Sequence, residues 1–388
     1  MKKFKAPTLQ YPKFPANTQI FARPSGFCDQ QLYCCDYYHG AISNAPSAYT
    51  FLNKPYIDGV SLVIRWNRVE TAQGVYNWTY LDALVNDAKL VYGKKIAFYL
   101  FFIAYAKVPS NQRPVGNDGG LYHSFVPEYI MDDHVTYGGV AGHGGESETS
   151  LFPGEYLSVR WHNANVMARY NEFMIALANR YKNQIEYIYL DEFWTAVSNA
   201  ARAEIPGGDV ATKAAYIVQA KKDWYQYAWD AFQGGTAKVF CKANYLSATP
   251  NNNDAYDPLF QDWCGQTGKY FANESTPDMP LNFKYPFNLG ATTNTTGVVS
   301  TMENIAKSYP NRTHLCNTDT WGATFGSLTQ INASQAINTY RFYAKTLEGA
   351  SSGIIDIQIP DGVTRPEQPQ NGMWWRLIAP ILESRYLR

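Results

Sequence analysis

Charge of either sign is scarce in this chain, since only 17% of its 388 residues are charged. Lysine and arginine together number 33, and so do aspartate and glutamate, which gives a formal net charge of zero. A nucleic acid or an anionic membrane surface would favour a partner with a basic excess. We therefore expect neither a nucleic-acid partner nor a membrane partner.

Paired cysteines and long apolar runs are also lacking. The six cysteines form no Cys-x-x-Cys pair in a chain of this size, which excludes a disulfide scaffold and a zinc ribbon. No apolar run reaches the length of a membrane span. The first residues are basic but lack the apolar core of a signal peptide. The compartment therefore stays open, and it would be extracellular if a signal has been removed; the oligomeric state stays open too.

Aromatic residues, by contrast, make up 15% of the chain, with 30 tyrosines and 10 tryptophans. One interpretation is a core rich in rings. The other is that some rings line a cleft and stack on the apolar faces of sugars. Composition alone leaves both open.

Short apolar segments alternate with segments of helical period, which predicts a parallel sheet. Eight such units predict a (β/α)8 TIM barrel, formed as a single α/β domain by residues 19–388 after an extended arm, 1–18. The segment 107–157 is rich in Gly, His, Asp and Pro. A structureless loop of that length is usually either functional or a sign of a wrong assignment, and both stay open. The expected strands are 19–22, 57–65, 95–102, 185–190, 238–243, 269–272, 313–316 and 353–359, and the clearest expected helices are 159–181, 211–232, 297–309, 334–347 and 372–386.

The fourth expected strand, 185–190, is followed at once by two acids, Asp191 and Glu192, and then by Phe193 and Trp194. Carboxylates at the end of an apolar strand are costly unless they have partners or face a cleft. In an α/β barrel the active site lies at the carboxyl ends of the strands. Acids beside large rings at that position favour a sugar-cleaving site.

Two stretches resemble clan A glycoside hydrolases, especially the family 42 and family 35 β-galactosidases. Residues 161–181 resemble the helix that precedes the fourth strand in those enzymes. Residues 57–82 resemble their second-strand signature, with Thr71 in place of the usual proline; the matching residues are Gly59-Val60-Ser61, Trp66, Glu70-Thr71, Gly74, Tyr76, Asn77-Trp78 and Leu81-Asp82.

The resemblance implies that Glu192 is the acid/base of a glycosidase. Asp191 then replaces an asparagine that contacts the sugar, and two adjacent carboxylates perturb each other's pKa. The nucleophile of clan A is a glutamate at the end of the seventh strand, where this chain offers Asp319 instead. Glu274 is a rival, as are Asp356 and Asp361, and Asp319 could equally be a helix cap or turn residue.

The sequence therefore predicts a glycoside hydrolase that cleaves an oligo- or polysaccharide by a retaining, two-carboxylate mechanism, with Glu192 and Asp319 as the catalytic pair. Glu70 is expected to be structural. The acids and histidines of the loop 123–146 fit no compact metal motif, so we expect neither a metal nor a cofactor. The residues expected to contact the carbohydrate are Asp191, Trp66, Arg65, Trp194, Asn244, Tyr245, Trp321 and Glu274.

Two alternatives stay open. One is an α-galactosidase-like barrel with Asp191 as nucleophile and Glu274 as acid/base. The other is a non-catalytic or virion-associated carbohydrate-binding barrel, which the missing strand-seven glutamate and the missing signal peptide motivate. The sugar, the linkage and endo or exo action are not determined by the sequence.

Overall fold

The computed structural model describes a little over half of the chain. The described residues are 13–24, 52–102, 126–138, 140–143, 156–190, 193, 205–242, 257–274, 309, 313–318, 340, 343–344, 347, 352–359 and 379–384.

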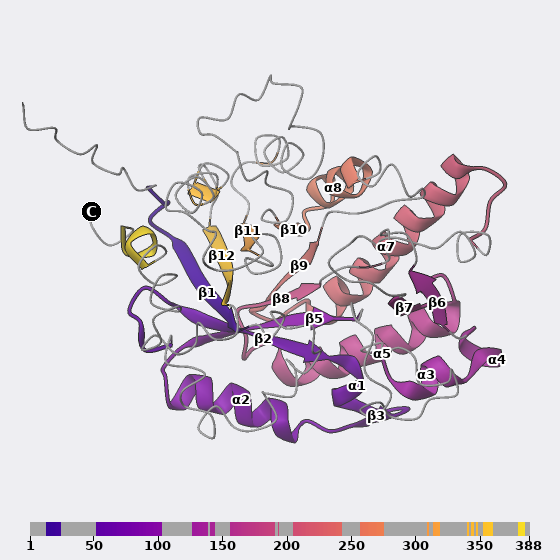
Figure 1. Ribbon diagram of the computed structural model, residues 1–388, viewed down its shortest axis with the longest axis horizontal. Coiled ribbons are helices and arrows are strands. Elements are labelled where there is room, and N and C mark those ends of the chain that lie inside the picture. Colours follow the sequence, from indigo (N-terminus) through magenta and orange to yellow (C-terminus); the bar gives the residue numbers. More distant parts are fainter. Residues whose placement is uncertain are drawn as a thin grey trace, which may run out of the picture.

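Eight parallel strands close into a barrel (Figure 1). Every expected strand is present, and β1 pairs with β12 and β2 to close the ring. The sequences of these strands are rich in β-branched and aromatic residues. Such residues suit a closed parallel sheet because both of its faces are covered. The strands, in chain order, are β1 (Thr18–Pro24), β2 (Gly59–Arg65), β5 (Lys95–Phe101), β8 (Tyr187–Leu190), β9 (Lys238–Lys242), β10 (Tyr270–Glu274), β11 (Thr313–Thr318) and β12 (Ser352–Ile359).

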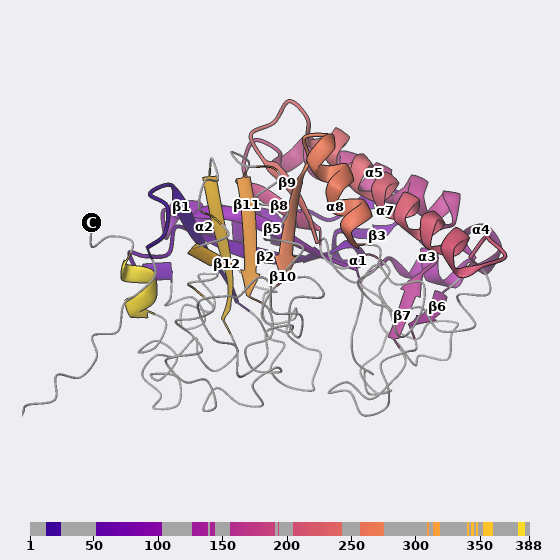
Figure 2. The same cartoon turned by 90° about the horizontal axis from the view of Figure 1, so that it is seen from above.

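Four long helices connect consecutive strands in the described residues: α2 (Thr79–Leu90), α5 (Ala164–Tyr181), α7 (Val210–Phe232) and α8 (Asp257–Gln266). α5, α7 and α8 lie side by side along one flank of the barrel (Figures 1 and 2). The expected helix 297–309 lies outside the described residues except for its last position, whereas 340, 343–344, 347 and 379–383 are helical, as expected. No helix in the described part of the chain is long and apolar enough to cross a membrane.

Two helix predictions need correction. α5 begins at Ala164 rather than at 159, because the side chain of Asn163 accepts hydrogen bonds from the backbone N–H groups of Asn165 and Val166. Of the residues expected in this helix, Val159 ends a strand, β7 (Tyr156–Val159), and residues 160–162 form the turn before the cap. α8 was not expected, although Phe260 and Cys264 are both fully buried at helical spacing.

The excursion between β5 and β8 is more regular than the expected loop. It contains α3 (Glu128–Asp132), α4 (His134–Tyr137) and β6 (Val140–His143), which pairs antiparallel with β7. The excursion after β2 contains α1 (Trp66–Val69) and a small hairpin of β3 (Glu70–Ala72) and β4 (Val75–Tyr76). Both excursions leave from the carboxyl ends of neighbouring strands, because β2 pairs with β5.

Buried rings fill two parts of the core. Inside the barrel, Tyr99, Tyr187 and Tyr189 pack with Phe21 and Phe240. Between the barrel wall and the helices lies a second group that includes the indoles of Trp66, Trp161 and Trp224, none of which has any exposed surface. For these rings the structure supports the core interpretation of the aromatic excess.

The segment before β1 is packed rather than free where it is described. Phe14 is fully buried and meets Tyr340 edge to face, with ring centroids 6.3 Å apart. β1 begins at Thr18, one residue earlier than expected. Residues 1–12 of the predicted arm lie outside the described residues.

Candidate active site

The order of the barrel strands shows which strand each of the two predicted catalytic acids follows. β8 is the fourth barrel strand along the sequence and β11 is the seventh, with β9 and β10 between them in the sheet. Asp191 and Glu192 directly follow the last residue of β8, and Asp319 directly follows the last residue of β11. Because all eight strands are parallel, their carboxyl ends lie at one end of the barrel.

Buried residues flank the acid pair on both sides. Leu190, before the pair, has no exposed surface, and Phe193, after it, is 1% exposed. The ring of Phe193 lies 5.7 Å from that of Trp161 and 5.2 Å from that of Trp224, measured between centroids. The chain is therefore fixed immediately before and immediately after Asp191 and Glu192.

Most of the predicted site residues lie outside the described residues. Glu274 is the last residue of β10, and only its backbone is described; its Cα is in register with that of Asn317 on β11. Arg65, the last residue of β2, is partly exposed and stays a candidate. Those outside the described residues are Asp191, Glu192, Trp194, Asn244, Tyr245, Asp319 and Trp321, as is the rival Asp361.

Trp66 is not a stacking platform in this structure, contrary to the prediction. Its side chain is fully buried, stacks on Phe173 at 5.2 Å and donates its indole N–H to Glu70 Oε2 at 2.6 Å. The sequence places Trp66 directly after a strand end, but it begins α1, which turns the ring outward between the barrel and α5. A ring enclosed in this way cannot contact a sugar.

Glu70 has the structural role expected of it. Its carboxylate is fully buried and forms an ion pair with Arg169 of α5. Oxygen Oε1 also accepts hydrogen bonds from the N–H of Gly74 and the hydroxyl of Tyr129, each at 2.8 Å. One carboxylate therefore joins the β3–β4 hairpin, α3 and α5. Arg169 and Tyr129 carried no sequence signal that linked them to Glu70, since 59 to 99 residues separate them from it.

A second buried charge cluster lies inside the barrel. The Nε atom of Arg23 on β1 is 3.6 Å from Oδ1 of Asp356 on β12, and both side chains are almost fully buried. The hydroxyl of Tyr187 donates to Oδ2 of Asp356 at 2.9 Å, and the guanidinium of Arg23 lies 3.8 Å from the centroid of Tyr99. Burial and the adjacent Asp356 carboxylate raise the pKa of Tyr187 well above its usual value, so it stays a proton donor.

This cluster argues against Asp356 as the nucleophile, one of the rivals to Asp319. A nucleophile must reach a sugar carbon, yet Asp356 has no exposed surface and two partners hold its oxygens. Its Cα is in register with that of Asn317, two residues before Asp319. Arg23, Asp356 and Tyr187 thus form a polar cluster inside the barrel, contributed by the next-to-last residue of β1, the middle of β12 and the first residue of β8. Among the described residues, no group of three His, Cys, Asp or Glu side chains is placed to hold a metal ion.

Comparison with known proteins relates this barrel to solved structures. No family model matches the sequence, and no curated protein matches it. The catalytic domain of β-amylase from Paenibacillus polymyxa superposes with a TM-score of 0.54 at 10% identity, over 95% of this chain and 99% of that one. At this identity the match shows a shared fold, the TIM-barrel fold.

Two further solved structures have lower scores. A GH5-4 broad-specificity endoglucanase from an uncultured bacterium gives a TM-score of 0.48 at 13% identity, over 87% of this chain and 84% of that one. PbGH5A, a glycoside hydrolase family 5 enzyme from Prevotella bryantii B14 in complex with a xyloglucan tetradecasaccharide, gives 0.47 at 8% identity, over 95% and 96%. These three structures are all of enzymes that act on glycosidic bonds.

Proposed function

We propose that this protein is a glycoside hydrolase that cleaves an oligo- or polysaccharide with net retention, with Glu192 as acid/base and Asp319 as nucleophile. The observation that carries the proposal is the order of strands in the closed barrel, in which carboxylates directly follow the fourth and the seventh strand. The fold shared with the β-amylase catalytic domain supports the part of the proposal that concerns cleavage of a glycosidic bond. So does the resemblance of residues 57–82 and 161–181 to the family 42 and 35 enzymes.

The proposal includes the complete fold: a full (β/α)8 repeat that begins with β1 at Thr18, one residue before the predicted boundary at 19, and is preceded by an N-terminal arm. Around the catalytic pair we propose a sugar-contacting set from several strand ends. Aromatic residues in this set would stack on sugar rings, and its polar residues would bind hydroxyl groups. The set comprises Asp191, Arg65, Trp194, Asn244, Tyr245, Trp321 and Glu274.

In the proposed reaction Glu192 protonates the leaving oxygen while Asp319 attacks the anomeric carbon. The glycosyl–enzyme ester that results is then hydrolysed by water, from which Glu192, now ionised, removes a proton. The negative charge of Asp191 beside Glu192 favours the protonated form that the first step needs. No cofactor takes part in this scheme.

The test uses Glu192→Gln and Asp319→Asn on a panel of glycans and on aryl glycosides with acidic phenol leaving groups. Loss of a general acid lowers the rate on ordinary glycans by about 10²–10⁴-fold. A phenolate leaves without a proton, so Glu192→Gln should retain the first step on aryl glycosides. Asp319→Asn should lose activity on both kinds of substrate.

The matched control is Glu186→Gln. Glu186 lies just before β8, at the opposite end of the strand from Glu192, and pairs with Lys95 at 3.3 Å on a partly exposed surface. This variant should retain full activity. If glycan hydrolysis survives in both the Glu192 and the Asp319 variants, the assignment of the pair is wrong.

The same panel separates the two alternatives. Loss of activity in Asp191→Asn and Glu274→Gln, with activity retained in the Glu192 and Asp319 variants, would establish the α-galactosidase-like arrangement. The absence of a glutamate after the seventh strand favours a barrel without catalysis as the second candidate. A parent protein that binds several glycans and cleaves none would establish that candidate.

A further inference from the structure

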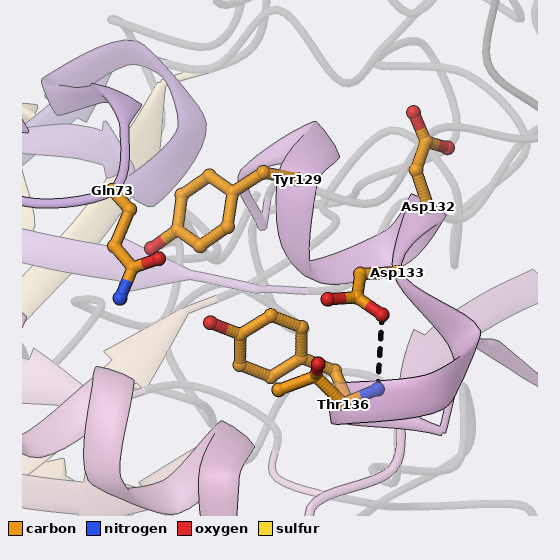
Figure 3. Close-up of a pocket in the computed structure, with 6 residues that line it drawn as sticks. Gln73, Tyr129, Asp132, Asp133 and Thr136 are labelled. Atoms are coloured by element: carbon orange, nitrogen blue, oxygen red, sulfur yellow. Dashed lines mark hydrogen bonds between the residues drawn. The ribbon is translucent and has the colours of Figure 1, made fainter.

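A pocket of about 560 Å³ lies between the β3–β4 hairpin and the helices α3 and α4 (Figure 3). Its volume falls within the range of about 300–1,000 Å³ that small-ligand sites occupy. None of the predicted site residues belongs to it. The lining consists of Gln73, Tyr129, Asp132, Asp133, Thr136 and Tyr137.

The lining carries acceptors, hydroxyl groups and rings, but no lysine or arginine. Carboxylates, an amide and hydroxyl groups bind the hydroxyls of a sugar, and phenol rings cover its C–H faces. Two carboxylates without a cation repel an anionic ligand. A metal ion is disfavoured, because Asp133 already accepts the N–H of Thr136 at 2.9 Å, and the described residues hold no group of three metal-ligating side chains.

Both walls of the pocket are fixed to the same buried carboxylate. Glu70 accepts the N–H of Gly74, which follows Gln73 in the hairpin turn, and it accepts the hydroxyl of Tyr129 on the opposite wall. Arg169 holds Tyr129 from the other side, with its Nε 3.0 Å from the phenol oxygen. The pocket therefore needs little rearrangement before it binds a ligand, which lowers the entropic cost of binding.

Gln73 provides a side chain that is available for a ligand. It is exposed and, within the described part of the chain, makes no hydrogen bond. In Figure 3 the amide oxygen of Gln73 points toward the hydroxyl end of Tyr129, while the carboxylate of Asp133 is turned toward Thr136. Replacing Gln73 therefore changes the pocket without breaking the network beneath it.

The pocket lies at the same end of the barrel as the proposed catalytic pair. The hairpin follows the carboxyl end of β2, and α3 and α4 follow that of β5. β5 pairs with β8, the strand before Glu192. We infer that the pocket is a distal subsite, which holds one uncharged sugar unit of a longer oligosaccharide whose cleaved bond lies over β8 and β11. The choice of an oligosaccharide rests on the proposed function, whereas the lining alone specifies an uncharged polyol.

Binding is measured by titration calorimetry in the Glu192→Gln/Asp319→Asn double variant, which removes turnover. The probes are neutral hexasaccharides (cello-, xylo-, manno-, malto- and galacto-), the trisaccharide of each, a galacturonate hexamer and calcium chloride. At least one neutral hexasaccharide should bind. Adding Gln73→Ala should weaken its binding about fivefold, the value of one hydrogen bond between uncharged groups. For the trisaccharide of the same sugar, Gln73→Ala should weaken binding less than twofold.

The control substitution is Gln219→Ala, an exposed glutamine on α7 that bonds only Asp223 among the described residues; it should change nothing. Equal hexasaccharide affinity with and without Gln73→Ala would overturn the inference, and cleavage by the parent would then leave the proposed function intact. If the hexasaccharide affinity depends on Gln73 but the parent cleaves none of these glycans, the pocket binds sugar and the proposed function is wrong. Binding of calcium alone, equal binding of the galacturonate hexamer, or no binding of any probe would also overturn the inference.

Discussion

Replacing Glu70 by glutamine should destabilise the folded protein far more than the small change in shape suggests. Glu70 has no exposed surface, and its two oxygens accept from four groups. An amide has one oxygen to offer and turns its NH₂ toward these donors. Of its two ion pairs, Arg169, whose side chain is 7% exposed, would keep only the one with Glu172, which is 58% exposed.

The expected loss follows from the burial of the pair. Removing one partner of a buried ion pair costs about 3–5 kcal/mol, because the remaining charge is left without compensation. Glu172 offsets part of this cost from the solvent side, so we expect a value near the lower end, about 3 kcal/mol. The β3–β4 hairpin and α3 should loosen first, since both are attached to α5 through this carboxylate.

The assay is guanidinium unfolding of the parent and Glu70→Gln at equal protein concentration, with the slope held common so that the midpoint reports stability. The matched control is Asp82→Asn. Asp82 pairs with Arg180 on a surface where both side chains are 33–41% exposed, and such pairs contribute about 0–1 kcal/mol. If Glu70→Gln costs no more than Asp82→Asn, the Glu70 network does not stabilise the fold and the reasoning is refuted.

Three other expectations follow from the described contacts. Asp356→Asn should cost about 3 kcal/mol in the same unfolding assay, because Arg23 loses its charged partner in the barrel interior; a loss below 1 kcal/mol would contradict the burial of that pair. Asn163→Ala should cost about 1 kcal/mol through loss of the cap of α5, and Asn163→Asp should restore stability. The hydrogen bond from Arg180 lowers the pKa of Asp82, so its stabilising effect is present above the unfolded pKa of about 4 and is lost as the pH falls through the lower folded value. The free energy of unfolding, measured from pH 6 to pH 2, should therefore fall less steeply for Asp82→Asn than for the parent.

Much of the fold could be predicted because it depends on how apolar residues are spaced along short stretches of the chain. Tyr187–Leu190 is an apolar run bounded by a helix and two acids, and the structure makes it the fourth strand of the barrel. α7 was expected within one residue of its bounds, since Ile217 and Trp224 repeat at helical spacing and are buried. α8 was missed because its apolar stripe is short: in DPLFQDWCGQ the described apolar residues that are fully buried at helical spacing are only Phe260 and Cys264.

The site was harder to predict because its contacts join distant segments. A strand-end position suggested that Trp66 would face a cleft, but the turn of α1 directs it into the core, and one residue of register decides between these outcomes. The partners of Glu70 lie 59 to 99 residues away along the chain. Nothing in the local sequence indicates that Arg23 and Asp356, 333 residues apart, would meet when the barrel closes.

The buried indoles have a consequence for how this protein interacts with light. Trp161 and Trp224 lie 5.9 Å apart at a steep angle, and Tyr170 stacks on Trp224 at 5.5 Å. Rings held close together in one fixed, asymmetric arrangement couple their electronic transitions, and the near-ultraviolet circular dichroism that results is lost once side-chain packing is lost. Since α5 carries Tyr170 and α7 carries Trp224, the part of this signal that arises from their coupling depends on whether the two helices are packed against each other.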